Sequence, residues 1–290
     1  MSWLQVTART VRDDAESVME CMESLEALSV TFADGADDPV LEPAPGETPL
    51  WQDTQVIGLW EADADREAIQ AGLQDHPAVQ SLHVEILEDR DWEREWMTHF
   101  EPMQFGHRLW IVPSWTDAPD PDAVNILLDP GLAFGTGTHP TTALCLEWLD
   151  SQPIEGRQIT DYGCGSGILA IAALRLGAAR ALGVDIDPQA LEASRDNAEK
   201  NAVSDRLDVF LPEQMPEHQS DVVVANILAG PLAQLSGTIL SCLKPGGRIA
   251  LSGILEDQAE PVMQAYRHRI DWDTPVTQEG WVLLTGVSSA

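Results

Sequence analysis

The segment from Ile159 to Gly167 reads ITDYGCGSG, an apolar run that leads directly into glycines at alternate positions, Gly163, Gly165 and Gly167. Glycines in a strand-to-helix turn let the backbone approach a ligand that any Cβ atom would block. A second apolar run, ALGVDID, contains Asp185, 22 residues beyond Gly163. A carboxylate at the tip of the next strand is placed to accept both hydroxyls of a ribose. Together these features predict an α/β fold that binds a nucleoside cofactor.

The spacing of the glycines narrows the kind of cofactor. The dinucleotide fingerprint is G-x-G-x-x-G, whose last glycine lets the helix pack closely on the strand. This chain has G-x-G-x-G, with Ile168 where that last glycine would stand and the acidic Asp161 two positions before the first glycine. The triphosphate-binding pattern G-x-x-x-x-G-K-[ST] does not occur in the sequence. The glycine spacing therefore disfavours an NAD-dependent dehydrogenase, and the missing pattern disfavours a loop that binds a nucleoside triphosphate. The small Cys164 within the turn is expected to pack rather than react.

Length and composition indicate a globular protein of two domains. The chain has 290 residues and only four cysteines, with no C-x-x-C pair that would indicate a zinc framework. The apolar stretch ILAIAAL ends at Arg175 and is too short to span a membrane. The N-terminus lacks a basic start followed by an apolar block, so no secretory signal is expected. The sequence predicts a cytoplasmic protein, without a metal, that does not bind a membrane.

Acidic residues dominate the charge of the chain. There are 48 acids against 16 bases, a net charge of −32, and residues 1–90 hold 20 of the acids and four of the bases. Phosphate binding needs lysine and arginine, so direct DNA binding is not expected. Such a surface attracts a basic protein partner. Adaptation to high internal salt produces the same composition, and the sequence leaves both explanations open.

The first 90 residues predict a small α+β domain. Apolar periodicity predicts strands near 2–10, 29–35, 54–62 and 81–89 and helices near 13–28 and 65–76. The order β-α-β-β-α-β is typical of a ferredoxin-like unit.

A tryptophan-rich connector is predicted for residues 91–129. Its aromatic residues are Trp92, Trp96, Phe100, Trp110 and Trp115. They could form a platform that stacks on bases, but few basic residues accompany them, which favours packing between domains.

From residue 130 to residue 290 the pattern predicts a Rossmann-like, doubly wound α/β domain. Strands are expected near 158–162, 181–186, 207–211, 221–226, 248–253 and 281–287, and helices near 140–150, 167–177, 188–201, 229–243 and 257–269. Ligands in such sheets bind beyond the carboxyl ends of the strands. Gly163, Asp185 and Asn226 all fall at such ends.

Two further segments bear on the chemistry. LDPGLAFGTGTHPTT, at residues 128–142, is a glycine-rich loop before the first core helix of the second domain. DVVVANILAGPL, at residues 221–232, delivers Asn226 to a strand end. Its N-I-L-A-G-P-L resembles the N-P-P-[YF] element of methyltransferases that act on amino groups, without that element's prolines and aromatic residue. Because the aromatic stacks on a flipped base, its absence disfavours amines of nucleic-acid bases.

Acid-x-G-x-G-x-G, from Asp161 to Gly167, resembles motif I of the S-adenosyl-L-methionine-dependent methyltransferases. With the two segments above and with GVDIDPQAL, it is similar from about residue 90 onward to the ribosomal protein L-eleven methyltransferase family, the PrmA type. The resemblance implies trimethylation of lysine ε-amines and of the N-terminal α-amine of that ribosomal protein, which the small N-terminal domain recognises. It also implies cofactor-binding residues, which are Thr142, Asp161, Gly163, Gly165, Gly167, Asp185 and Asn226.

The chemistry of an amine acceptor suggests further roles. A free lysine has a pKa of about 10.4, and desolvation in a cleft lowers it so that the amine becomes neutral. We expect Asn226 and the carbonyls of Ile227 and Leu228 to orient the lone pair, and Phe134 with its loop to exclude water. His139 could accept a proton, although a structural role fits its position beside Pro140 better.

The alternatives that remain are an amine methyltransferase for another protein or a small molecule, and an inert module that binds the cofactor or docks on the ribosome. A monomer is expected, because no self-complementary helix stands out in the sequence.

Overall fold

The computed structural model describes residues 2–36, 51–87, 100–129 and 139–289, and the chain divides into two compact units, Met1–His99 and Phe100–Ala290. The prediction for Phe134 and those for Trp92 and Trp96 lie outside the described residues. Among the described helices, none has the length and apolar character needed to cross a membrane.

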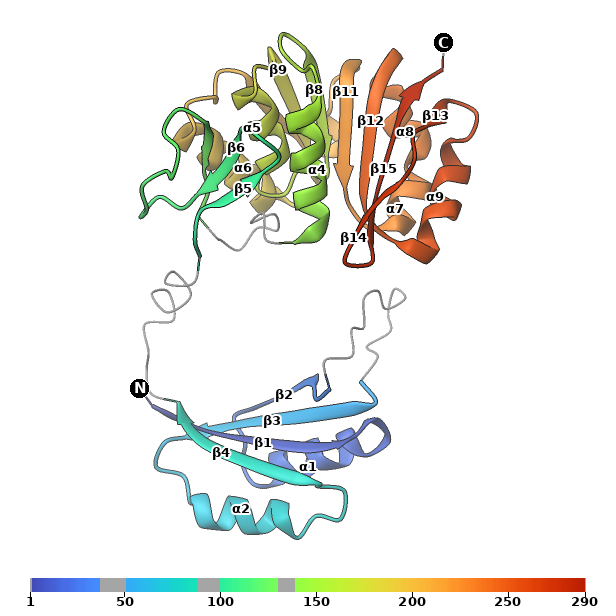
Figure 1. The fold of residues 1–290 in the computed structure, drawn as a ribbon. Helices are drawn as coiled ribbons and strands as arrows, with labels where there is room; N and C mark the ends of the chain where they lie inside the picture. The colour runs from blue at the N-terminus through green and yellow to red at the C-terminus, as the bar shows by residue number, and fades with distance from the viewer. Residues whose placement is uncertain (1, 37–50, 88–99, 130–138, 290) are drawn as a thin grey trace. The chain divides into compact units, whose positions relative to one another are not determined.

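The N-terminal unit is a four-stranded antiparallel sheet with two helices on one face (Figure 1). Its elements are β1 (Trp3–Val11), α1 (Ala15–Ser24), β2 (Ser29–Asp34), β3 (Asp53–Glu61), α2 (Arg66–Gln74) and β4 (Ser81–Leu87). Alternate residues of β1 and β3 are buried, and they pack with residues of both helices such as Val18, Met22, Ile69 and Leu73. The strand order β2-β3-β1-β4 confirms the predicted ferredoxin-like arrangement.

The second unit contains a large mixed sheet of eight strands. Its strands are β8 (Gln158–Tyr162), β9 (Arg180–Val184), β10 (Leu207–Phe210), β11 (Ser220–Asn226), β12 (Leu243–Leu255), β13 (Ile270–Trp272), β14 (Val276–Gln278) and β15 (Trp281–Ser288). The order is β10-β9-β8-β11-β12-β15-β13, with β14 paired to β15. The first five strands are parallel to one another, and β15 runs antiparallel to β12. The Rossmann-like, doubly wound prediction is therefore confirmed, with an antiparallel edge.

The helices of this unit are α4 (Pro140–Ser151), α5 (Ile168–Arg175), α6 (Pro188–Lys200), α7 (Ala229–Gln234), α8 (Ser236–Ser241) and α9 (Ala259–Tyr266). The single helix expected near 229–243 is two short helices, and β12 begins earlier than expected, at Leu243. One hydrophobic core includes residues of α4 and α5, and a second lies on α7, α8 and α9. The helices thus pack with the sheet in two separate hydrophobic cores, as a doubly wound fold requires.

Residues 100–129 differ from the expected connector, because they pack into the second unit. They form a three-stranded sheet of β5 (Met103–Phe105), β6 (Leu109–Val112) and β7 (Val124–Leu127). Phe105, Ile111 and Ile126 are buried in the same core as α4 and α5. Asp150 of α4 anchors this sheet, since its carboxylate accepts the His107 N–H at 2.7 Å and Arg108 Nε–H at 3.0 Å.

Candidate functional site

The glycine turn follows β8 and requires a backbone that other residues rarely adopt. Gly163, Gly165 and Gly167 have φ angles of +83°, +52° and +77°, in the left-handed region that glycine enters without strain. The N–H groups of Gly163 and Cys164 both donate to Val184 O, at 2.7 and 3.0 Å. A Cβ added at Gly163 would lie 2.1 Å from Ile227 Cγ2. The turn therefore depends on glycine for conformation and for space.

Asp185 follows β9, and two backbone groups hold its carboxylate. Its Oδ2 accepts the Gly165 N–H at 2.9 Å, and its Oδ1 accepts the Asp187 N–H at 3.0 Å. Each carboxylate oxygen has about two lone-pair sites, so both oxygens can still accept a hydroxyl. The glycine turn and Asp185, which the sequence spacing associates with each other, are thus linked by a direct hydrogen bond.

Asp161 lies beneath this turn and is only 1% exposed. Its Oδ2 accepts the Ala170 N–H, in the first turn of α5, at 3.1 Å. Its Oδ1 is buried and has no hydrogen-bond partner among the described residues. Burial raises the pKa of Asp161 to about 7, and the negative charge of Asp185 acts in the same direction. An ionised Asp161 is therefore a buried charge for which a cationic ligand group would be a suitable partner.

Asn226 ends β11, and its side chain is held by α4. Its Nδ2 donates to Oγ1 of the buried Thr142 at 3.2 Å. This contact turns the amide so that Oδ1 faces away from the threonine. In the part of the chain that the structure describes, no hydrogen bond to Asn226 Oδ1 is present. The amide oxygen is therefore available to an N–H donor.

The chain leaving β11 is enclosed between two glycines, one of which the sequence did not indicate as important. A Cβ at Gly253, where φ is +84°, would lie 2.3 Å from Ile227 O. Gly253 falls inside β12, where the register with β15 shifts between Leu251 and Ile254. Glycine within a strand indicates a close approach of another backbone segment, so the sequence alone could have marked Gly253 as important.

The carbonyls of Ile227 and Leu228, which were expected to help orient the amine, already have contacts within the protein. Leu228 O already accepts the Leu232 N–H at 3.1 Å in α7, and Ile227 O is packed against Gly253. The side-chain oxygen of Asn226, by contrast, accepts no hydrogen bond among the described residues.

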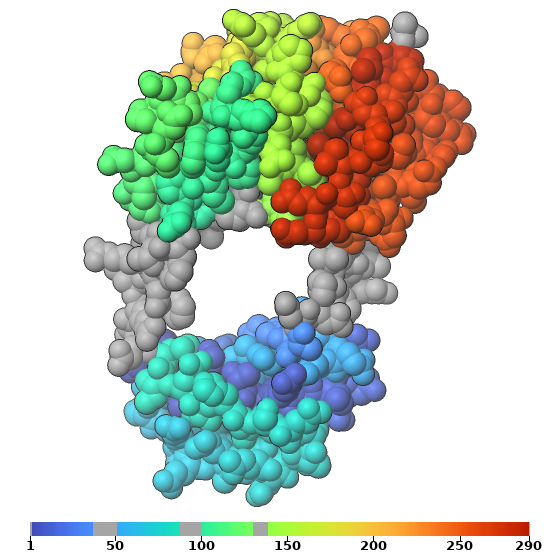
Figure 2. Space-filling model, viewed as in Figure 1, coloured from blue at the N-terminus to red at the C-terminus, as the bar shows by residue number. Residues whose placement is uncertain are grey.

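His139 is the N-cap of α4. Its Nδ1 accepts the Thr141 N–H at 3.3 Å and lies 2.8 Å from Thr141 Oγ1. The ring meets Trp281 edge to face at a centroid distance of 4.8 Å. Burial lowers the pKa of His139, which the charge of Glu279 opposes. The strands β14 and β15 pack against α4, and in Figure 2 the red surface of the C-terminal strands lies against the green surface of that helix. Of the two expected roles, the observed contacts are those of a structural cap.

Ile186 is a residue that the motif analysis missed. It directly follows Asp185, and its apolar side chain is 83% exposed. The strand expected near 181–186 included it, whereas β9 ends at Val184; the available signal was its position between Asp185 and Asp187. Groups of histidine, cysteine and acidic side chains able to hold a metal ion are absent from the described ranges.

The carboxyl ends of β8, β9 and β11 thus bring together the glycine turn, Asp161, Asp185, and Asn226 with Thr142. These residues would suit S-adenosyl-L-methionine, because they combine a turn open to close approach, a fixed carboxylate able to accept ribose hydroxyls, and a buried carboxylate able to pair with a cationic ligand group. Fold and site together define a Rossmann-like methyltransferase that uses S-adenosyl-L-methionine as the methyl donor.

Comparison with known proteins identifies the family. The model of the ribosomal protein L11 methyltransferase (PrmA) family matches residues 2–289, and the chain belongs to this family, in agreement with the L-eleven resemblance of its motifs. A ribosomal protein L11 methyltransferase from Hahella chejuensis is 59% identical over 287 residues, which are 99% of this chain and 98% of that protein. One from Edwardsiella ictaluri is 56% identical over 292 residues, 99% of each chain.

A solved structure agrees with this family. The ribosomal protein L11 methylase from Lactobacillus delbrueckii subsp. bulgaricus is 31% identical and superposes with a TM-score of 0.57, covering 66% of this chain and 99% of that chain.

Proposed function

We propose that this chain transfers methyl groups from S-adenosyl-L-methionine to lysine ε-amines and to the N-terminal α-amine of ribosomal protein L11, up to three per nitrogen. The names of its relatives support the substrate. The observation that carries the amine chemistry is the Asn226 amide oxygen: the amide nitrogen is held by Thr142, and the residue lies at the carboxyl ends of the strands, as Asp185 and the glycine turn do.

The cofactor-binding roles follow from what each group can accept or contact. Asp185 would accept the ribose hydroxyls while Gly165 and Asp187 hold its carboxylate. The turn at Gly163, Gly165 and Gly167 would let the methionine part approach the backbone, with Asp161 as the nearby negative charge. Ile186 would present an apolar surface to the adenine ring. Thr142 would act through Asn226.

The reaction depends on positioning, because the bound S-adenosyl-L-methionine supplies a methyl group that its sulfonium has already activated. The protein must bring a neutral amine into line with that methyl group. Asn226 Oδ1 would accept one N–H of the amine and so aim the nitrogen lone pair. The apolar residues that follow it, Ile227 and Leu228, would help to exclude water, which favours the neutral amine. Phe134 remains a proposed contributor to this exclusion.

The remaining proposals concern the partner. The acidic N-terminal unit, residues 1–90 by the sequence pattern, would recognise ribosomal protein L11, either free or on the large subunit. We expect the enzyme to act as a monomer in the cytoplasm, without binding DNA or a membrane directly.

Mass spectrometry of purified ribosomal protein L11 after incubation with the enzyme and S-adenosyl-L-methionine tests the proposal. Mass gains in multiples of one methyl group, mapped to lysines and the N-terminus, are expected. An unmodified protein, with methylation of a small-molecule amine in a parallel reaction, would instead identify the alternative substrate class.

A further inference from the structure

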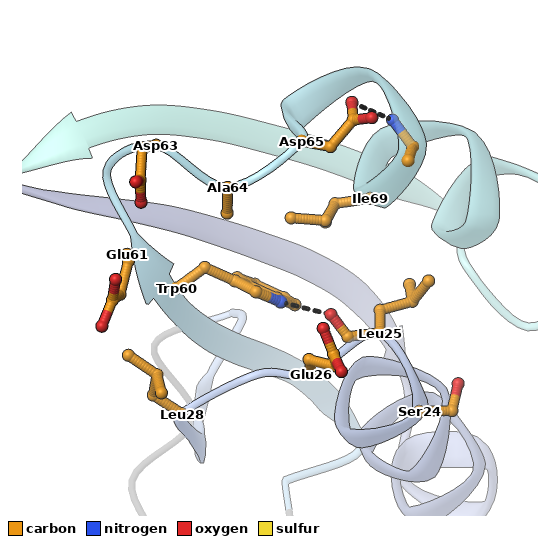
Figure 3. A pocket seen from close by; sticks show the side chains of 11 residues that line it. Ser24, Leu25, Glu26, Leu28, Trp60, Glu61, Asp63, Ala64, Asp65 and Ile69 are labelled. Carbon is orange, nitrogen blue, oxygen red and sulfur yellow. Dashed lines mark hydrogen bonds between the residues drawn. The ribbon is translucent and has the colours of Figure 1, made fainter.

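The N-terminal unit has a hollow of about 590 Å³ beside the end of α1 and the turn between β3 and α2 (Figure 3). Its apolar part includes Trp60, Ile69 and Leu28. Trp60 is 2% exposed and forms part of the core, whereas Leu28 is 57% exposed. The hollow therefore combines a packed apolar wall with an apolar side chain that faces solvent.

The hollow is surrounded by carboxylates, and none of the described residues that line it is basic. Glu26, Glu61 and Asp63 line it and are exposed, and within the described part of the chain none of the three makes an ion pair or a side-chain hydrogen bond. Asp65 also lines it, but its carboxylate accepts the Ala68 N–H at 3.0 Å as the N-cap of α2. Arg66, the nearest base in the sequence, is not one of the lining residues.

Hydrogen bonds of the protein fix the walls of the hollow. The Trp60 indole N–H donates to Leu25 O at 2.8 Å, which joins β3 to the end of α1. The Leu28 N–H donates to Leu59 O at 2.8 Å, so the chain is tied to β3 again directly after α1. Glu26 lies in the chain between the two bonded residues, Leu25 and Leu28, and has a φ of +64°. In Figure 3, Glu26 and Glu61 flank Trp60. The carboxylates are thus attached to a preformed wall.

We propose that this hollow binds the side chain of a lysine or arginine presented by a protein partner. The occupant is identified by complementarity: a long aliphatic stem would pack on the exposed Leu28 and Ala68, and its charged end would meet the free carboxylates. Acids on a convex surface are individually screened by solvent, whereas carboxylates around a concave apolar wall focus their field. The inference rests on the proposed function, because it takes the partner to be the protein substrate, ribosomal protein L11.

The test uses the full-length enzyme with Glu26→Gln, Glu61→Gln and Asp63→Asn combined. The matched control is Glu16→Gln, Glu20→Gln and Asp75→Asn, which neutralises three exposed carboxylates of the same unit outside the hollow. We expect the hollow variant to raise the KM for ribosomal protein L11 about three- to tenfold, as loss of several exposed ion pairs would, with kcat unchanged. The control should leave both values within about twofold of wild type.

A second measurement separates this inference from the proposed function. A fluorescein-labelled pentalysine peptide should bind the wild-type enzyme and the control more tightly than the hollow variant, and its acetyl-lysine counterpart should bind none of them. This holds even where ribosomal protein L11 is not methylated at all, which would refute only the proposed function. Equal affinities of pentalysine for the hollow variant and the control would overturn the inference, since binding would then reflect total charge. An unchanged KM in the hollow variant, with L11 methylated, would also overturn it.

Discussion

At the scale of single residues, the Thr142–Asn226 contact can be tested by matched variants. Thr142→Val keeps the shape of the side chain and removes the oxygen that accepts the Asn226 Nδ2–H. We expect kcat to fall about tenfold, because the amide oxygen is no longer aimed at the amine. Thr142→Ser restores an acceptor and should recover most of the turnover. Steady-state kinetics on ribosomal protein L11 gives the comparison; equal rates for the two variants would show that orientation of the amide is unimportant.

Removal of the amide itself should have a larger effect. Asn226→Ala is expected to lower turnover at saturating cofactor by about 100-fold, as loss of a positioned polar group in an active site does. Binding of S-adenosylhomocysteine, measured by calorimetry, shows whether the cofactor site is intact in the variant. Full turnover by Asn226→Ala would reject the proposed role of this residue.

Asp161 should make stability depend on pH. Its folded-state pKa of about 7 lies above the value of about 3.9 for an unfolded aspartate. Between these values the folded chain keeps a proton that the unfolded chain has released. The free energy of unfolding without cofactor should therefore fall as pH rises from about 4 to about 7 and then level off.

Asp161→Asn provides the control for this pH dependence, because its amide oxygen can still accept the Ala170 N–H and does not titrate. Urea denaturation of both proteins between pH 5 and pH 8 measures the difference. Parallel pH profiles would mean that Asp161 does not carry a raised pKa.

At the scale of elements, the glycine turn offers a test of strain against steric overlap. Gly163 and Gly156 both have left-handed φ angles, +83° and +72°, but a Cβ at Gly163 meets Ile227 Cγ2 whereas one at Gly156 meets nothing within 4 Å. Gly156→Ala should destabilise the fold by about 1–2 kcal/mol from backbone strain alone. Gly163→Ala should cost about 1–3 kcal/mol more and abolish cofactor binding, because the side chain of Ile227, which directly follows β11, must move to make room. Urea denaturation and calorimetry check both, and similar losses would indicate strain only.

The elements also show what could be read from the sequence. The parallel strands and the glycine turn were predictable because each is a local pattern: an apolar run, a turn residue and a cap such as Asp187, which accepts the Gln189 N–H. The sheet β5–β6–β7 was not predicted, because its strands have three or four residues. It is fixed by distant side chains: Asn201, for example, bonds both the N–H and the carbonyl of Leu127.

The candidate site divides in the same way. The glycines and Asp185 lie on recognisable spacings, and the structure brings them into contact. The Thr142–Asn226 bond joins residues 84 positions apart. The packing of Gly253 on Ile227 joins β12 to the segment that follows the neighbouring strand β11. Contacts of this kind depend on the register of the sheet, which no local pattern specifies.

At the scale of the whole molecule, the excess of acids should oppose folding at low salt. The net charge is −32, and exposed like charges repel one another over a Debye length of about 10 Å at 0.1 M salt. Many of the few bases are already paired, as Arg9 is with Asp53 and Lys244 with Asp221. We expect the free energy of unfolding to rise between about 0.05 and 1 M sodium chloride, where the Debye length falls to about 3 Å.

The same change in salt should act in the opposite direction on the recognition of a basic protein. If the acidic N-terminal unit attracts ribosomal protein L11, screening should raise the KM for that substrate over the range in which it stabilises the fold. Denaturation and steady-state kinetics in the same buffers separate the two explanations of the charge. A KM that rises with salt indicates steering of the partner, whereas a constant KM with increasing stability indicates that the acids serve only as adaptation to salt.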